Sequence, residues 1–276
     1  ATDPGATGTG AVSVGALSAK GGITLKGTAV TLNGALAVTT AGAGVSITGP
    51  TTLAGSGGTI ALTGSNAAND VTLGSVNGAH ALNITAGGGD IVLGAVGPTV
   101  TGVTLSGNTA SLAAVTTTGA QDYSGVTTTT LNGTLAVGTA GFGIRAGAVS
   151  LGAGGGTLTL TGSDAANDVT LGTVNGAQGL NITAGGGDIV LGAVGPTTTG
   201  VTLAANTASL GSVTTTGAQD YSSVTTTTLN GALAVGTAGF GIIAGAVSLG
   251  AGAGGGTLTL TGSNAANDVT LGSVNG

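Results

Sequence analysis

The chain of 276 residues contains no cysteine, methionine, tryptophan or glutamate, and only two phenylalanines and two tyrosines. So few large side chains cannot fill a wide core, so any interior has to be narrow and lined by small aliphatic residues. This favours an elongated structure over a sphere. The lack of cysteine also suits a long protein that crosses an envelope unfolded, because disulfides would block that passage.

Positive charge is almost absent. The three basic residues are Lys20, Lys26 and Arg145, and the net charge of −6 comes from nine aspartates. Such a chain lacks the basic surface that binds phosphate backbones or anionic lipid heads, which argues against nucleic acid and membrane surfaces as partners. No run of eighteen apolar residues is present, so we expect no transmembrane helix and no membrane insertion.

The first twelve residues, ATDPGATGTGAV, have neither a basic segment nor an apolar one, and they lack an initiator methionine. They are therefore not a signal peptide, and we interpret the sequence as a mature or excerpted segment.

What the chain does contain is glycine and small aliphatic residues. It has 60 glycines, 41% hydrophobic residues and only 4% charged residues. Disordered chains combine low hydrophobicity with high charge, so this composition predicts a folded protein. The density of glycine and β-branched residues disfavours helix throughout.

A long repeat dominates the sequence. Residues 59–78, 157–176 and 257–276 are near copies; the second differs from the first at four of twenty positions and from the third at two. We expect one β-solenoid domain over residues 1–276, divided into the long repeats 1–58 (partial and divergent), 59–156, 157–256 and 257–276 (partial).

A shorter period of about twenty residues lies inside each long repeat. LTL at 158–160 is followed by DVTLGTV at 168–174, and LNI at 180–182 by DIVLGAV at 188–194. Alternating apolar residues between Gly, Asn, Asp and Pro predict short strands and turns. Two-strand units of this kind cannot bury their apolar face alone, but stacked in parallel they form a continuous thin core.

The sequence therefore predicts an all-β fold, a parallel β-helix with about 20 residues per coil. Five coils would span one long repeat, with the register uncertain near Tyr123 and Tyr221. About fourteen coils at ~4.8 Å each would measure roughly 65 Å. Because each coil needs only its neighbours, duplication adds length without requiring a new core. The sequence stops without a polar cap after TLGSVNG, which predicts either more chain or another molecule at that end.

These repeats resemble a known class. LTLTGSNAANDVTLGSVNG, LNITAGGGDIVLGAVG and GAVSLGAGGGTLTLTG are similar to the repeat region of large exported bacterial surface proteins, the filamentous-haemagglutinin-like and autotransporter adhesins. The resemblance covers essentially the whole chain. It implies a right-handed parallel β-helix exposed outside a Gram-negative cell. The secretion domain and membrane anchor of that class have no counterpart in this sequence.

The aspartates are the main candidates for chemistry. Asp70 and Asp90 are twenty residues apart, as are Asp168 and Asp188, and each pair would stack about 5 Å apart in neighbouring coils. Such pairs fit a calcium site, the only cofactor we consider, or the two carboxylates of a retaining glycosidase. The favoured interpretation is that each carboxylate caps a turn by accepting backbone N–H bonds. No aromatic or basic group accompanies the pairs, and the G-G-x-G-x-D calcium pattern is not matched.

Other features have structural interpretations. The AGGGD runs at 86–90 and 184–188 are followed by no lysine or helix start, so they predict tight corners and not phosphate cradles. A single histidine, His80, and no cysteine argue against a nucleophile triad. His80 matches Gln178 in the next repeat and Arg145 matches Ile243, so we expect both to be ordinary surface residues.

Aromatic and threonine residues recur in register between repeats. Tyr123, Tyr221, Phe142 and Phe240 are expected to fill a wide part of the core or a corner. The VTTTTL runs raise an ice-binding hypothesis, but that activity requires outward threonines in many successive coils. Ladder packing explains threonine as well.

The resulting functional expectation is a non-enzymatic shaft or fibre segment of a secreted bacterial cell-surface protein, adhesin-like. Its partners would be its own chain continuation or identical subunits end to end, with host or surface glycans or proteins as further candidates. The alternative is a subunit of an extracellular filament or sheath. A polysaccharide-acting enzyme and an ice-binding protein are weaker alternatives.

Overall fold

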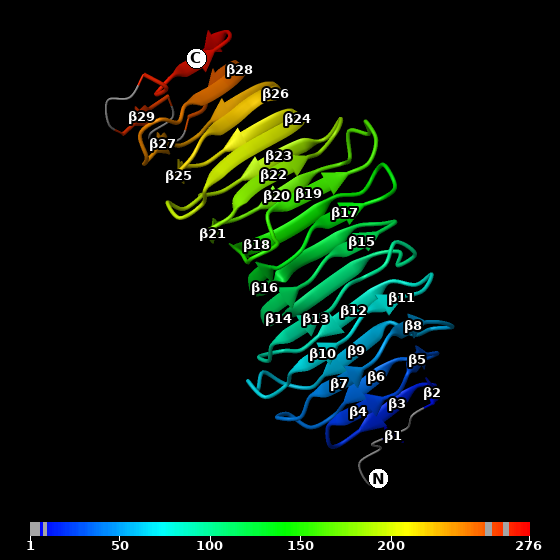
Figure 1. The fold of residues 1–276 in the computed structure, drawn as a ribbon. Helices are drawn as coiled ribbons and strands as arrows, with labels where there is room; N and C mark the ends of the chain where they lie inside the picture. The colour runs from blue at the N-terminus through cyan, green and yellow to red at the C-terminus, as the bar shows by residue number, and fades with distance from the viewer. Residues whose placement is uncertain (1–5, 8–9, 252–255, 262–264) are drawn as a thin grey trace. The chain divides into compact units, whose positions relative to one another are not determined.

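The computed structural model describes residues 6–7, 10–251, 256–261 and 265–276, and it forms two compact units, Ala1–Thr130 and Leu131–Gly276. Each unit consists of short parallel strands stacked coil on coil (Figure 1). The described residues contain strands and turns but no helix. The chain is therefore a β-solenoid, as the sequence predicts, with about 12 turns whose strands lie about 21 residues apart.

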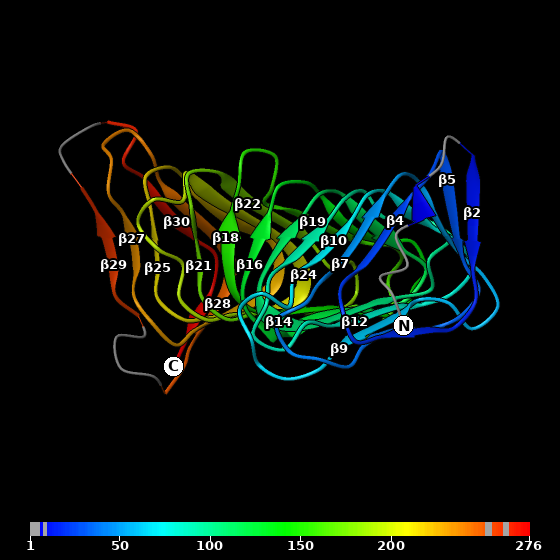
Figure 2. The ribbon, with the colours of Figure 1, turned by 90° about the horizontal axis from the view of Figure 1, so that it is seen from below.

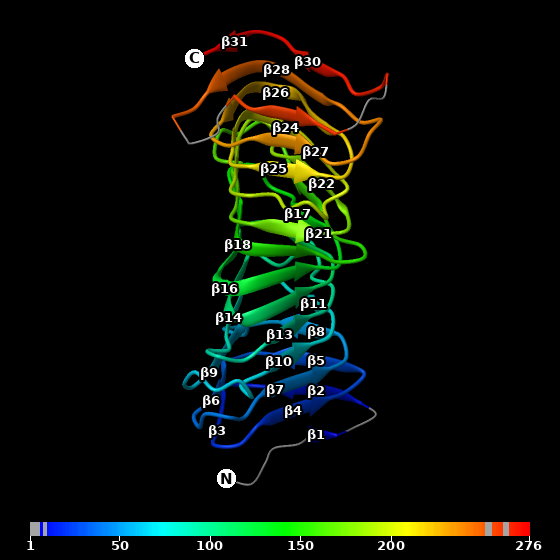
Figure 3. The same cartoon turned by 90° about the vertical axis from the view of Figure 1, so that its left-hand side faces the viewer.

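In unit 1 three ladders of strands run in parallel, and each coil contributes to all three (Figure 3). The first ladder contains β3 (Leu17–Ala19), β6 (Leu36–Val38), β9 (Thr59–Leu62), β12 (Leu82–Thr85) and the first half of β14 (Val103–Leu112). The second contains β1 (Ala6–Thr7), β4 (Ile23–Lys26), β7 (Val45–Thr48), β10 (Val71–Leu73), β13 (Ile91–Leu93) and the second half of β14. The third contains β2 (Ala11–Val14), β5 (Ala29–Leu32), β8 (Thr51–Leu53), β11 (Val76–Asn77), Val96 and β15 (Val115–Thr117). The strand β16 (Gln121–Leu131) pairs with β14.

Unit 2 also has three ladders, which are numbered separately from those of unit 1. The first ladder contains β17 (Leu135–Val137), β19 (Thr157–Leu160), β22 (Gly179–Thr183), the first halves of β24 (Gly200–Leu210), β26 (Gln219–Leu229) and β28 (Ile242–Leu249), and β30 (Val269–Leu271). The second contains the first half of β18 (Ile144–Leu151), β20 (Val169–Leu171), β23 (Asp188–Leu191), the second halves of β24, β26 and β28, and β31 (Val274–Asn275). The third contains the second half of β18, β21 (Val174–Gly176), Val194, β25 (Val213–Thr215), β27 (Leu233–Val235) and β29 (Leu258–Leu260). Figure 2 shows β25, β27 and β29 side by side.

The core is a stack of aliphatic side chains in register. Val71 pairs with Ile91, and Ile91 with Ala110; all three are at most 1% exposed. The intervening residues point outward, so strands of the VTL type bury two of their three side chains. Each fully buried Val, Leu or Ile contributes roughly 1.5–3 kcal/mol, and the narrow interior expected from the composition is observed.

Two details of the predicted coil are wrong. The sequence predicts one strand for DVTLGTV, but the chain bends at Gly172 and forms β20 and β21, which belong to different ladders. A third ladder per coil was therefore missed. The predicted fourteen coils are about 12 because some coils are longer than twenty residues; Ile144, for example, pairs with Val169.

The long repeat does not contain a whole number of coils, which corrects the expected five. Ile144 and Ile242 are equivalent residues 98 positions apart. Along the second ladder, four complete turns lead from Ile144 to Thr227. Two further ladders then lead to Ile242, which lies in the first ladder. One copy therefore spans four and two-thirds turns.

The coil around the tyrosines has its own construction. In β24, β26 and β28 the first and second ladders join into one long strand, and the register between β26 and β28 shifts between Tyr221 and Thr226. Tyr221 is fully buried at this point. The uncertain register predicted there is thus an irregularity of the ladder itself, because a coil that contains tyrosine needs a wider corner.

Candidate functional site

The structure stacks the paired aspartates in neighbouring coils, as predicted. In unit 2 the N–H of Asp188 donates to Asp168 Oδ1 at 3.0 Å. Asp188 Oδ1 in turn accepts the N–H and the hydroxyl of Thr207, at 3.1 and 2.9 Å, and the amide of Asn206 at 3.2 Å. One acidic oxygen thus connects the coil of Asp168 to that of Asp188, and another connects the coil of Asp188 to that of Thr207.

The same arrangement occurs in unit 1. The N–H of Asp90 donates to Asp70 Oδ1 at 3.0 Å, and Asp90 Oδ1 accepts bonds from Asn108 and from the N–H and hydroxyl of Thr109. The Thr109 hydroxyl is the largest influence on the pKa of Asp90, and with the weaker donors it holds this pKa below its ordinary value, although partial burial acts in the opposite direction. The aspartates accept backbone N–H bonds, as predicted, but the N–H groups belong to the next coil and not to the aspartate's own turn.

Cation binding at Asp70, Asp90, Asp168 and Asp188 stays a prediction. Within the described ranges, no three His, Cys, Asp or Glu side chains gather in a group that could hold a metal. The aspartates meet in pairs, and one oxygen of each is engaged by N–H or O–H donors. Calcium would have to use their remaining oxygens.

Sequence reasoning missed the asparagine that directly precedes Asp70 and Asp168. Asn167 is fully buried; its Oδ1 accepts the N–H of Gly141 at 2.8 Å and its Nδ2 donates to the carbonyls of Thr161 and Gly162. Asn69 makes the same contacts in unit 1, and Asn267 bonds Gly239 in the third copy. The recurrence of this asparagine in AAND was the signal that could have identified it.

These asparagines connect two loops of neighbouring coils by hydrogen bonds. We define the loop pair as the turn 138–143 together with the loop 161–168 of the next coil, and the equivalent turn 236–241 together with the described part of 261–268. Phe142 and Phe240 lie in these turns and are 41% and 44% exposed. Of the two predicted places, the core or a corner, the phenylalanines lie at a corner, in turns between ladders.

The tyrosines, in contrast, lie in the core as predicted. The hydroxyl of Tyr221 donates to Gln219 Oε1 at 3.1 Å, and Gln219 Nε2 donates to Thr215 Oγ1 at 3.1 Å and to the Ala234 carbonyl at 2.8 Å. The equivalent Tyr123 makes the same bond to Gln121 at 3.0 Å. Burial raises the pKa of both phenols, so they are neutral donors.

The glycine runs form corners. Gly185 has φ of +61°, and a Cβ on it would collide with the carbonyl oxygen of Gly162 in the coil below. Only glycine fits where the backbone is left-handed and a neighbouring coil lies this close. The predicted tight corner is confirmed.

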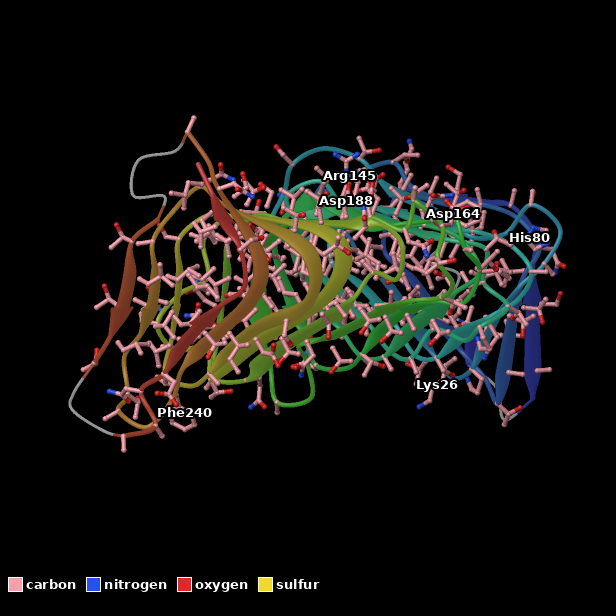
Figure 4. All side chains as sticks on the ribbon, turned by 90° about the horizontal axis from the view of Figure 1, so that it is seen from above. Lys26, His80, Arg145, Asp164, Asp188 and Phe240 are labelled. Carbon is pink, nitrogen blue, oxygen red and sulfur yellow. The ribbon has the colours of Figure 1, made fainter. Side chains whose placement is uncertain are left out.

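The single histidine lies in unit 1 and the arginine in unit 2. His80 is half-buried in the turn between β11 and β12, and Arg145 is exposed on β18 (Figure 4). Arg145 and its counterpart Ile243 lie in different ladders of unit 2, so their comparison does not describe a substitution at one place.

One threonine of each threonine run points inward. Thr129 and Thr227, the third threonines of the two VTTTTL runs, are fully buried, and their hydroxyls have no hydrogen-bond partner in the described part of the chain. Outward positions on the ladders instead hold short, mostly uncharged side chains. On the second ladder of unit 1 the outward residues are Thr24, Ser46, Thr72, Val92 and Ser111.

Comparison with known proteins identifies no relative: no family model, no curated protein and no solved structure matches the chain. The described residues also contain no helix with the length and hydrophobicity that a membrane crossing requires. The class of this protein is thus defined by its own geometry, a parallel β-solenoid with three ladders per turn.

Proposed function

We propose that this chain is a structural segment, a shaft or fibre, of a secreted bacterial cell-surface protein of the adhesin type. The observation that carries this proposal is the neighbour-only pairing of the coils. Within each unit the described strands pair only with strands of the coil directly before or directly after them. A molecule built in this way lengthens by duplication, and its sequence contains the duplications.

The polar residues add support because they connect coils. Asp168 bonds the coil of Asp188, and Asp188 bonds the coil of Thr207. The surface position on the cell rests on the resemblance of the repeats to those of exported adhesins. Glycans or proteins of a host or surface are the partners that such a shaft would carry an adhesive element towards.

Lengthening by duplication can be measured directly. Appending a further copy of residues 177–276 after Gly276 should extend the rod by about 22 Å, four and two-thirds turns at ~4.8 Å. Atomic force microscopy or electron microscopy of chains with none, one and two added copies would measure the increment. A Gly/Ser extension of equal length is the control and should add no rod. Added copies that leave the rod length unchanged would contradict a shaft.

The enzyme alternative has a separate test. Replacing Asp70, Asp90, Asp168 and Asp188 with Asn should not change the release of reducing ends from polysaccharides, which we expect to equal the buffer blank. A loss of activity in this variant would favour a glycosidase. The calcium hypothesis would gain support if millimolar calcium raised the melting temperature of the unaltered chain and not that of the variant.

A filament subunit is the second candidate, and one observation favours it. Val269 and Val274 are 44% and 51% exposed, whereas the equivalent Val169 and Val174 are fully buried beneath the next coil. A further coil on β30 and β31, from more chain or from another molecule, would cover them. If molecules stack there, Val269→Lys should abolish fibres seen by electron microscopy. Val190→Lys, at a side position that is also 44% exposed, should not.

A further inference from the structure

The mismatch between the long repeat and the coil moves equivalent residues from one ladder to another. Ile144 lies in the second ladder of unit 2 and its counterpart Ile242 in the first. Leu158 lies in the first ladder and its counterpart Leu258 in the third. Other equivalent pairs shift by one ladder in the same direction; these are Leu135 with Leu233, Val169 with Val269, and Val174 with Val274.

The shift applies to the loop pair as well. The turn that contains Phe142 connects the first ladder to the second, because it lies between β17 and β18. The turn that contains Phe240 connects the third ladder to the first, because it lies between β27 and β28. Figure 4 agrees: Asp164, from the first loop pair, and Phe240, from the second, lie on different sides of unit 2.

We infer that each added copy of the long repeat places its loop pair at a different corner of the solenoid, so that the loop pair rotates around the axis from copy to copy. A copy of 98 residues at 21 residues per turn advances by four turns and two ladders. Three such copies amount to fourteen complete turns, so the true structural period of the shaft is three long repeats. The exposed phenylalanines of successive copies therefore lie at different corners around the shaft and not along one edge.

A repeat of whole coils would give a different molecule. All copies of the loop pair would then form one ridge, and a partner that binds it would have to approach from one side. Coils of 20 residues are available to this chain, since Val174 pairs with Val194. A repeat of five such coils would therefore fit the same ladders. The fold itself thus does not require the loop pair to rotate from one copy to the next.

The test uses the absence of cysteine from the chain, which makes introduced cysteines unique spin-label sites. One variant contains Phe142→Cys and Phe240→Cys. The control contains Arg145→Cys and Ser248→Cys, two outward positions five steps apart on the second ladder. All four positions lie in unit 2, and circular dichroism checks that both variants keep the β fold.

Electron–electron distance measurements on the two spin-labelled variants then show whether the loop pairs lie at different corners or at the same corner. The control labels should be about 24 Å apart, five steps of ~4.8 Å. The phenylalanine positions are closer along the axis, about 22 Å, but the offset between corners should bring their separation to about 30 Å, since one-third of a coil is about seven residues of ~3.3 Å each. A distance between the labels at positions 142 and 240 that is clearly longer than the control distance supports rotation of the loop pair. A distance equal to or below the control overturns it.

Discussion

The two long repeats 59–156 and 157–256 make the same contacts between coils but differ inside the core. Val100 in the first corresponds to Thr198 in the second, and both are fully buried. Their carbonyls accept the same N–H bond, from Thr118 and Thr216 at 2.9 Å each. The Thr198 hydroxyl, however, has no partner in the part of the chain that the structure describes.

This difference shows which properties of a coil the fold requires. Threonine has the shape of valine, so the backbone of the coil is unchanged although a buried hydroxyl is left without a partner. The coil-to-coil bonds of Asp70 and Asp90 recur unchanged at Asp168 and Asp188. Shape and inter-coil bonds are therefore kept between copies, whereas an inward methyl and a hydroxyl can be exchanged.

The largest loss should come from breaking a corner that both repeats share. Gly87→Ala and Gly185→Ala each place a Cβ on left-handed backbone against a carbonyl of the coil below. We expect about 3 kcal/mol of destabilisation from the two effects together, measured by urea unfolding. Gly21→Ala is the control, because its Cβ would meet nothing within 4 Å. Equal losses at Gly21 and Gly185 would refute the steric argument.

A smaller loss should follow from removing the phenol hydroxyl of either copy. Tyr221→Phe leaves Gln219 Oε1 without its donor in the core, as Tyr123→Phe does for Gln121. A buried acceptor left unpaired costs about 1–3 kcal/mol, and the loss should be similar in the two copies. Thermal unfolding of both variants checks this. If either variant were as stable as the parent, the bond would have no structural role.

The Val100 and Thr198 difference can itself be reversed. Thr198→Val should stabilise the chain by about 1 kcal/mol because it removes a buried hydroxyl that lacks a partner. Val100→Thr should destabilise it by a similar amount. Thr202→Val, at an exposed outward position, is the control and should change the free energy of unfolding by less than about 0.5 kcal/mol. Stabilisation by the control and not by Thr198→Val would contradict the assignment.

Much of this architecture follows from the sequence because a β-solenoid is locally determined. The alternation in VTL and the spacing from Asp168 to Asp188 are sufficient to predict coils and stacked carboxylates. The third ladder was not predictable in the same way, because in some coils it is as short as the single residue Val194. The change of ladder between equivalent residues of successive copies was also not predictable, because it depends on the summed lengths of unequal coils.

The candidate site divides along the same line. It was predictable that Asp188 accepts a backbone N–H bond, because an aspartate at a strand entry commonly does so, but not that the N–H belongs to the next coil. The loop pair was not predictable, because it depends on Asn167 reaching Gly141, 26 residues earlier and in another coil. Contacts of this kind depend on which coil lies below, and repeated short motifs do not specify that by themselves.

The smallest effect should be on the pH dependence of the melting temperature. This measurement separates the charge of the Asp90 carboxylate from its hydrogen bonding. The pKa of Asp90 is lowered in the folded chain, chiefly by the Thr109 hydroxyl, so the carboxylate stabilises the fold above its unfolded pKa of about 3.9. That contribution is lost as the pH falls through the folded pKa. Asp90→Asn should therefore show a smaller drop in melting temperature between pH 7 and pH 3 than the parent chain. Asp164→Asn removes the same charge from a loop where Oδ1 accepts one backbone N–H, and it is the control. An equal drop in the Asp90→Asn and parent chains would mean that the stacked carboxylate acts by shape alone.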